Sequence, residues 1–136
     1  MKQGIIFVLI LFGSVGACFS QEKINLNNTI ADSLKPNVTV QKLMSDQHQS
    51  SFLIWVNDTV KPHYHKRHSE SIYIIEGSGI FYIGKEKMHL KAGDFFLIPQ
   101  GIIHSYKNTG TKPSKVLSIQ TPEFAGKDRI WVEKQE

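Results

Sequence analysis

The sequence predicts an all-β domain, either a β-sandwich or a β-barrel. Short segments rich in β-branched and aromatic residues recur along the chain, and Gly, Pro and Asn residues separate them. No window has a convincing helical period of apolar residues. Many short strands at regular spacing are typical of sandwiches and barrels, in which the strands bury one face in a shared core.

The expected strands follow one another through the central part of the chain. They are residues 38–43, 51–56, 71–76, 79–83, 87–90, 94–98, 104–108 and 115–121. Turn residues connect them at 57–58, 77–79, 84–85, 92–93 and 99–101. Residues 128–132 predict either one more short strand or a cover over one opening of the barrel.

Two segments are expected to precede this domain, which spans residues 38–136. Residues 1–20 predict a cleavable signal peptide, because Lys2 precedes an apolar run from Ile5 to Phe12 and small residues follow. The run is shorter than the roughly 20 apolar residues of a transmembrane helix. Residues 21–37 are polar and predict a surface arm rather than a second domain.

The signal peptide predicts an exported protein, either periplasmic or secreted. Cleavage after Ser20 leaves a soluble chain, which we favour. Cleavage before Cys18 leaves a lipid-anchored cysteine, since residues 15–18 resemble a bacterial lipoprotein box, although Gly16 and Phe19 make the box imperfect. Cys18 is the only cysteine, so the mature domain has no internal disulfide and depends on its apolar core.

The charge distribution argues against nucleic-acid binding. The formal net charge is +4, and the lysines are spread along the chain without an interleaved stripe of aromatic and basic residues. Lys61, Lys66 and Arg67 flank a histidine pair, where solvated loop charges are the simplest account. The expected partner is therefore a small molecule and not a nucleic acid.

Four residues have the types and spacing of a metal site: His63, His65, Glu70 and His104. Side chains two apart on a strand project from the same face, so His63 and His65 can direct two imidazoles at one point. A third imidazole and a carboxylate from neighbouring strands complete a nitrogen and oxygen ligand set for a divalent transition metal. The metal ion expected is manganese, iron, nickel or zinc.

Several other polar residues are expected to have no part in this site. His68 lies in the loop before Glu70 and is expected to be exposed to solvent, as are His48 and His89. Asn108 is expected to order a turn through bonds from its side chain to the backbone. Glu76 is expected in solvent at the end of a strand.

The spacing of these residues resembles the first motif of the cupin superfamily. That motif is Gly, five residues, His-x-His, three or four residues, Glu, six residues and Gly. His63, His65, Glu70 and Gly77 fit it, and Asn57 stands where the leading glycine is usual.

The second cupin motif is also matched, at every position. It is Gly, five residues, Pro-x-Gly, two residues, His, three residues and Asn, here Gly93, Pro99, Gly101, His104 and Asn108. The two motifs together span residues 57–108. The resemblance implies a double-stranded β-helix, or jelly-roll, barrel that carries a metal site.

The resemblance implies several functions and selects none of them, because fold does not fix function. The first hypothesis is a metal-dependent enzyme acting on an oxygenated small molecule such as a sugar or unsaturated sugar acid, by isomerisation or ring opening. The cupins that open unsaturated uronates often have glutamine at the position where this chain has Glu70. The alternatives are an iron- or nickel-dependent dioxygenase and a non-catalytic metal-loaded barrel that binds a ligand. An open metal site favours an enzyme over a binder.

Three further residues have expected roles under the first hypothesis. Tyr106 shares a face with His104 and is expected to donate or shuttle a proton. Lys61 or Arg67 is expected to bind a substrate carboxylate. Small cupins commonly pair through their edge strands, so the resemblance also implies a homodimer.

Overall fold

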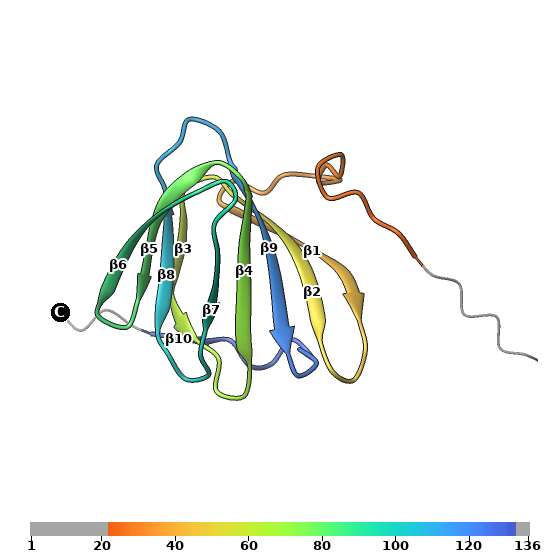
Figure 1. Cartoon of the computed structure of the whole chain (residues 1–136), viewed down its shortest axis with the longest axis vertical. Helices are drawn as coiled ribbons and strands as arrows, with labels where there is room; N and C mark the ends of the chain where they lie inside the picture. Colours follow the sequence, from red (N-terminus) through yellow and green to blue (C-terminus); the bar gives the residue numbers. More distant parts are fainter. Residues whose placement is uncertain (1–21, 133–136) are drawn as a thin grey trace, which may run out of the picture.

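The computed structural model describes residues 22–132, which form two antiparallel sheets that face each other (Figure 1). The strands are β1 (Val38–Ser45), β2 (Ser50–Val56), β3 (Thr59–Tyr64), β4 (Ser69–Glu76), β5 (Ser78–Ile83), β6 (Glu86–Lys91), β7 (Phe95–Ile98), β8 (His104–Asn108), β9 (Ser114–Thr121) and β10 (Ile130–Trp131). The first sheet has the order β1-β2-β9-β4-β7 and the second has the order β10-β3-β8-β5-β6.

The prediction of an all-β domain is confirmed, since the described residues contain strands, turns and bends and no helix. Residues 22–132 accordingly include no helix long and apolar enough to cross a membrane. The expected signal peptide and Cys18 lie outside the described residues.

The strand β3 is absent from the strands that the sequence predicts. Pro62 lies in its middle and has no N–H to donate, which disrupts the pattern by which strands are recognised. The pairing of β3 with β8 shifts register between Val60 and His63, so the proline is accommodated at an irregularity in the ladder.

The C-terminal segment forms one edge of the second sheet. Of the two alternatives for residues 128–132, the strand is correct: Ile130 pairs with Tyr64, and Trp131 pairs with His63. The strand β10 thereby covers the outer edge of β3. This short pairing brings the C-terminal segment close to the histidine pair.

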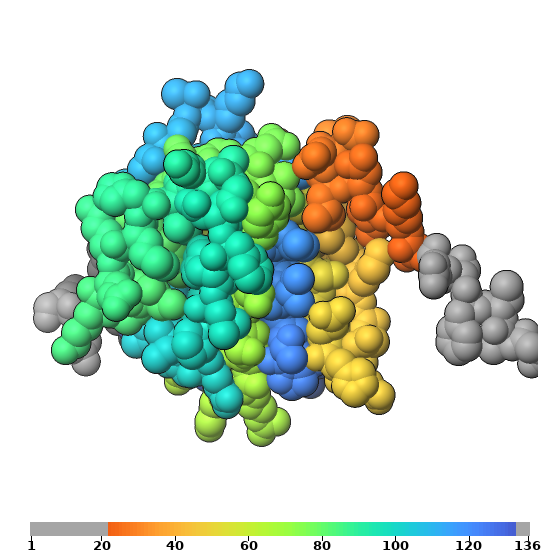
Figure 2. All heavy atoms as spheres, viewed as in Figure 1, coloured from red at the N-terminus to blue at the C-terminus, as the bar shows by residue number. Residues whose placement is uncertain are grey.

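The N-terminal arm contains no strand in residues 22–37 and packs at one end of the first sheet (Figure 2). The Lys115 ammonium group donates a 3.2 Å hydrogen bond to the Asn27 carbonyl, and the Asn57 side chain donates to the carbonyls of Lys35 and Pro36. These contacts fasten the arm to the barrel.

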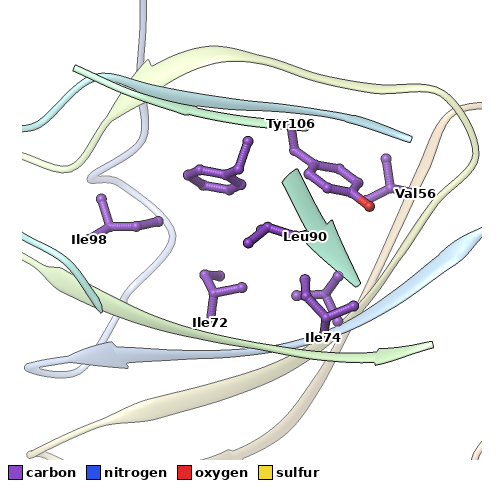
Figure 3. Close-up of a cluster of buried hydrophobic side chains, with 8 residues drawn as sticks. Val56, Ile72, Ile74, Leu90, Ile98 and Tyr106 are labelled. Atoms are coloured by element: carbon purple, nitrogen blue, oxygen red, sulfur yellow. The ribbon is translucent and has the colours of Figure 1, made fainter. Parts of the chain in front are cut away.

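The apolar core lies between the two sheets (Figure 3). Alternation on β4 places Ile72 and Ile74 inside and Tyr73 outside, since successive side chains of a strand point to opposite faces. The core cluster consists of Val56, Ile72, Ile74, Phe81, Leu90, Ile98, Tyr106 and Val116. Complete burial of one such aliphatic or aromatic side chain contributes about 1.5–3 kcal/mol, so the cluster can stabilise a domain without disulfides.

Gly79 and Asn108 determine how closely β5, β8 and the neighbouring loops pack against one another. A Cβ atom at Gly79 would lie 2.3 Å from the Tyr106 ring, so only glycine lets the ring cross β5 at this point. The Asn108 amide donates to the carbonyls of Val56, Asn57 and Lys112. The expectation that Asn108 orders a turn is therefore confirmed.

Candidate metal centre

The four predicted ligands converge at one point between the two sheets. Their nearest ligand atoms all lie within 4.8 Å of one another, and 2–4% of each residue is exposed. Glu70 comes from β4 in the first sheet, and His63 and His104 come from the paired strands β3 and β8 in the second. His65 is the first residue after β3 rather than a residue of the strand.

Backbone carbonyls fix the tautomer of each of the three histidines. A carbonyl only accepts, so each Nδ1 carries the hydrogen, and in the neutral ring the lone pair is on Nε2. The contacts are His63 Nδ1 to Lys61 O at 2.9 Å, His65 Nδ1 to Asp128 O at 2.7 Å and His104 Nδ1 to Ile102 O at 2.9 Å. The Nε2 atoms of His65 and His104 are buried without a hydrogen-bond partner.

Glu70 directs one carboxylate oxygen at these nitrogens. Its Oε1 accepts hydrogen bonds from the Ser118 hydroxyl and the Gln120 amide. Its Oε2 lies 3.5 Å from His65 Nε2 and 3.3 Å from His104 Nε2. With neutral rings no hydrogen lies between these atoms, so lone pairs face one another and a cation would satisfy all of them. The donor set therefore fits a divalent transition metal.

The protonation states suit the same role. Burial lowers the pKa of His63 from 6.5 to about 4, and the repulsion that His104 exerts in its protonated form is the next cause. Burial by itself raises the pKa of Glu70. Hydrogen bonds from His104 and His65, whose Nε2 atoms carry a hydrogen only in the protonated rings, and from Ser118 lower it by more, so the net pKa lies well below its usual range. At neutral pH the site thus holds an uncharged His63 and an ionised Glu70.

The expectation that His68 is exposed is wrong. Only 6% of His68 is exposed, its Nδ1 lies 2.5 Å from Asp128 Oδ2, and its Nε2 lies 2.9 Å from the Glu123 carbonyl. Both partners accept, so both ring nitrogens carry hydrogens and His68 forms an ion pair with Asp128. The sequence conceals this contact because the two residues are 60 positions apart.

His65, His68 and Asp128 also form a second group of potential ligand atoms. Both Nδ1 atoms are already engaged: Asp128 accepts from His65 through its carbonyl and from His68 through its carboxylate. Hydrogen bonds of this kind orient the histidine ligands of a metal and hold their tautomer. This group therefore orients His65, which is one of the candidate metal ligands. His48 and His89 are exposed, as expected.

A cavity of about 60 Å³ opens beside the centre. One buried water needs about 10–15 Å³ on this scale, so the cavity has room for several waters or a small ligand. Its walls are mostly apolar and include Val56, Val60, Ile72, Ile74, Phe81 and Val116. His63, Glu70 and His104 contribute to one part of the wall.

The remaining predicted site residues differ in their relation to the cavity. Tyr106 lines it, but its hydroxyl donates a 2.7 Å hydrogen bond to Ser114 Oγ, whose own hydrogen has acceptors in Ser78 and Asn108. Burial raises the pKa of Tyr106. Its role as a proton donor stays a prediction.

Lys61 and Arg67, the two basic residues expected to bind substrate, are exposed. Neither is among the residues that line the cavity. The basic residue that does line the cavity is Arg129, which sequence reasoning missed. Its position in the C-terminal segment, far from both motifs, gives no signal in the sequence alone.

Comparisons with known proteins agree with the fold and the motifs. A family model described as a cupin domain matches residues 51–120. An uncharacterized protein of Aquifex aeolicus is 38% identical over 96 residues, which cover 71% of this chain and 78% of that protein. Quercetin 2,3-dioxygenase of Bacillus subtilis is 34% identical over 50 residues, covering 37% of this chain and 15% of the enzyme.

A solved structure from Klebsiella pneumoniae, an uncharacterized conserved protein with a double-stranded β-helix domain, superposes with a TM-score of 0.71. It is 19% identical, and the match covers 85% of this chain and 100% of that one. Similarity at this level of identity concerns the fold. Together with the family match, which covers both histidine motifs, it shows that the chain belongs to the cupin family.

Proposed function

We propose that this cupin binds one divalent transition metal ion through His63, His65, Glu70 and His104 and acts as a small metal-dependent enzyme on an oxygenated small molecule. The observation that carries the proposal is the pair of buried, unpartnered Nε2 atoms of His65 and His104 that face Glu70 Oε2. An arrangement of three acceptor atoms with no donor among them is costly unless a cation lies between them.

The ligand set leaves about two positions of an octahedral ion open, which is typical of catalytic rather than structural sites. A bound manganese, iron, nickel or zinc ion would supply Lewis-acid polarisation of a substrate oxygen. The residues of the chain hold the ligand atoms in place, and the apolar wall excludes water from the bound molecule. The Ser118 and Gln120 side chains hold Glu70 so that Oε2 is directed at the site.

The cavity lining bears on the class of substrate. Its aliphatic and aromatic walls offer few hydrogen-bond partners, and each buried hydroxyl without a partner carries a desolvation cost. This favours a small molecule with one oxygenated, metal-binding end and an apolar body over a sugar with many hydroxyls.

A dioxygenase is the second candidate function, and the apolar lining is the observation that favours it. The local similarity to a quercetin 2,3-dioxygenase agrees with this class without deciding it, since it covers a small part of that enzyme. Turnover that consumes oxygen supports the dioxygenase, whereas turnover that is unchanged under argon supports an isomerase or lyase. A ligand recovered unchanged from the metal-loaded protein supports the third alternative, a binding barrel.

Elemental analysis of protein purified without chelators tests the metal site. We expect about one metal ion per chain in the wild type. His65→Ala should lose the ion and all turnover, and His89→Ala, which removes an exposed histidine, should retain both. A His65→Ala variant that keeps its metal or its activity would refute the assignment.

A further inference from the structure

A single basic side chain, Arg129, lies among the residues that line the cavity. Arg129 has an intermediate exposure, and its Nε is buried without a hydrogen-bond partner. Among residues 22–132 no carboxylate forms a salt bridge with it. Its guanidinium lies 5.8 Å from the centroid of the Trp131 ring. The cavity thus contains a cation whose donors have no acidic partner in the described part of the protein.

The backbone holds Arg129 in place from both sides. On one side, the Asp128 carboxylate accepts hydrogen bonds from the Lys66 and Arg67 backbone amides, at 3.1 and 2.7 Å, and from His68. On the other side, Ile130 pairs with Tyr64 in the second sheet. Arg129 therefore lies between two anchors, and its position relative to the metal ligands is fixed by the fold.

Arg129 lines the same cavity as three of the candidate metal ligands, which are His63, Glu70 and His104. The one acidic residue that lines the cavity is Glu70, whose two oxygens are already directed at Ser118 and Gln120 and at the histidine nitrogens. Glu70 is therefore not free to neutralise Arg129.

A ligand with a negative charge would complete this arrangement. Arginine presents planar, forked donors that match a carboxylate, and charge-assisted bonds of this kind are stronger in a partly buried site. An apolar wall, a metal centre and a guanidinium in one small cavity match three parts of one molecule: an apolar body, a metal-binding oxygen and an anionic group.

We propose that Arg129 binds the carboxylate of a small organic acid whose neighbouring hydroxyl or keto oxygen binds the metal ion. The inference rests on the proposed metal site and narrows its substrate class to 2-hydroxy or 2-oxo carboxylates with an apolar side chain. Arg129 then determines specificity, and it replaces the exposed Lys61 and Arg67 as the residue that recognises the carboxylate.

Ligand titrations of the Mn²⁺-loaded protein test this proposal without an activity assay. Lactate and its uncharged amide, lactamide, are probes of nearly equal size, and their binding is followed by the water-proton relaxation of the bound Mn²⁺. Wild-type protein should prefer lactate. Arg129→Gln should weaken lactate binding by about tenfold or more and change lactamide binding by less than about twofold, because the lost contact is charge-assisted.

Two further variants separate charge from fold. Arg129→Lys keeps a positive charge without the forked N–H donors of a guanidinium. Its affinity for lactate should lie between those of the wild type and Arg129→Gln. Lys127→Gln removes an exposed charge two positions away and should bind lactate as the wild type does. Mn²⁺ content measured for every variant shows whether the centre is intact, since its ligands come from both sheets.

The outcomes distinguish the two proposals. Wild-type protein that binds no Mn²⁺ or other transition metal overturns the metal site and the Arg129 proposal with it. Mn²⁺ bound at full occupancy, with a lactate preference that Arg129→Gln leaves unchanged, overturns the Arg129 proposal alone. The same holds if the wild type binds lactate no better than lactamide, or if the variant weakens both probes equally.

Discussion

At the scale of single residues, Glu70 has a different environment at each carboxylate oxygen. Donors from Ser118 and Gln120 satisfy Oε1, whereas Oε2 faces the lone pairs of His65 and His104. The first set of contacts orients the side chain, and the second leaves an acceptor that needs a cation. Removing the charge of Glu70 should therefore have opposite effects on metal binding and on the metal-free protein.

Glu70→Gln should weaken metal binding by at least about tenfold, because an amide is a poorer ligand than a carboxylate. In the presence of a chelator the same variant should be more stable than the wild type, by about 1 kcal/mol, because an amide N–H in place of Oε2 can donate to a histidine nitrogen. Metal titration and urea unfolding at about pH 8, which is above the ordinary pKa of a histidine side chain, measure the two effects. A variant that is less stable without metal would contradict the lone-pair interpretation.

The pKa of His63 predicts how acid affects the metal-free protein. The pKa is about 4 in the folded chain and 6.5 as a free side chain, so the unfolded chain binds this proton more tightly. The contribution of His63 to stability is therefore complete above pH 6.5 and is lost as the pH falls to about 4, by up to about 3 kcal/mol.

Unfolding of the wild type and of His63→Gln, compared at several pH values in the presence of a chelator, isolates this effect. The wild type should lose stability relative to the variant between pH 6.5 and pH 4. A difference between the two proteins that stays constant over this range would show that burial does not perturb His63.

At the scale of elements, the segment between β9 and β10 fastens the C-terminal end to the loop after β3. Asp128 accepts four hydrogen bonds from this loop: one through its carbonyl, from His65, and three through its carboxylate. The pairing of Trp131 with His63 continues the contact. The segment therefore positions one candidate metal ligand, His65, directly and places Arg129 in the wall of the same cavity.

Asp128→Ala should weaken metal binding by at most about tenfold, because it removes the carboxylate that positions residues 66–68 but keeps the carbonyl that accepts from His65. Asp46→Ala is a matched control, because Asp46 also accepts backbone amide hydrogen bonds in a loop, from His48 and Gln49, but lies outside the site. Isothermal titration with Mn²⁺ or Zn²⁺ measures both variants. Equal affinity in Asp128→Ala and Asp46→Ala would show that the carboxylate has no influence on His65.

At the scale of the whole molecule, the candidate metal centre joins the two sheets. Glu70 belongs to the first sheet, and His63 and His104 belong to the second. Unfolding separates these ligands, so a metal ion that binds them together binds the folded state and stabilises it by mass action. Metal binding is therefore linked to the stability of the entire domain.

Thermal unfolding should show this linkage. Metal at about 100 times its dissociation constant should stabilise the wild type by about 2.7 kcal/mol and raise Tm by several degrees. His104→Ala should show no such increase, and His89→Ala should match the wild type. An equal increase in His104→Ala would mean that the ion binds elsewhere.

Two expectations about the whole protein stay predictions. Export and lipid anchoring depend on residues outside the described range. The homodimer has a candidate surface on the outside of the first sheet, where Tyr73, Phe95 and Leu97 are exposed on the neighbouring strands β4 and β7. Sedimentation of the purified protein measures its oligomeric state directly.

The sequence by itself determined the fold class and the four candidate ligand residues. Alternation along β4 and β8 is a local property, so it could be read from residues such as Ile72 and Ile74 without knowledge of the fold. The motif spacing was equally local, and it identified four residues that the structure places together.

Tertiary structure alone decided what surrounds those ligands. The ion pair of His68 with Asp128 and the position of Arg129 in the cavity join the C-terminal segment to a loop about 60 residues earlier. The histidine tautomers depend on backbone carbonyls, among them that of Asp128. Periodicity and spacing describe neighbours along the chain, whereas these contacts depend on which strands pair and how the loops between them close, and only the folded chain fixes those distances.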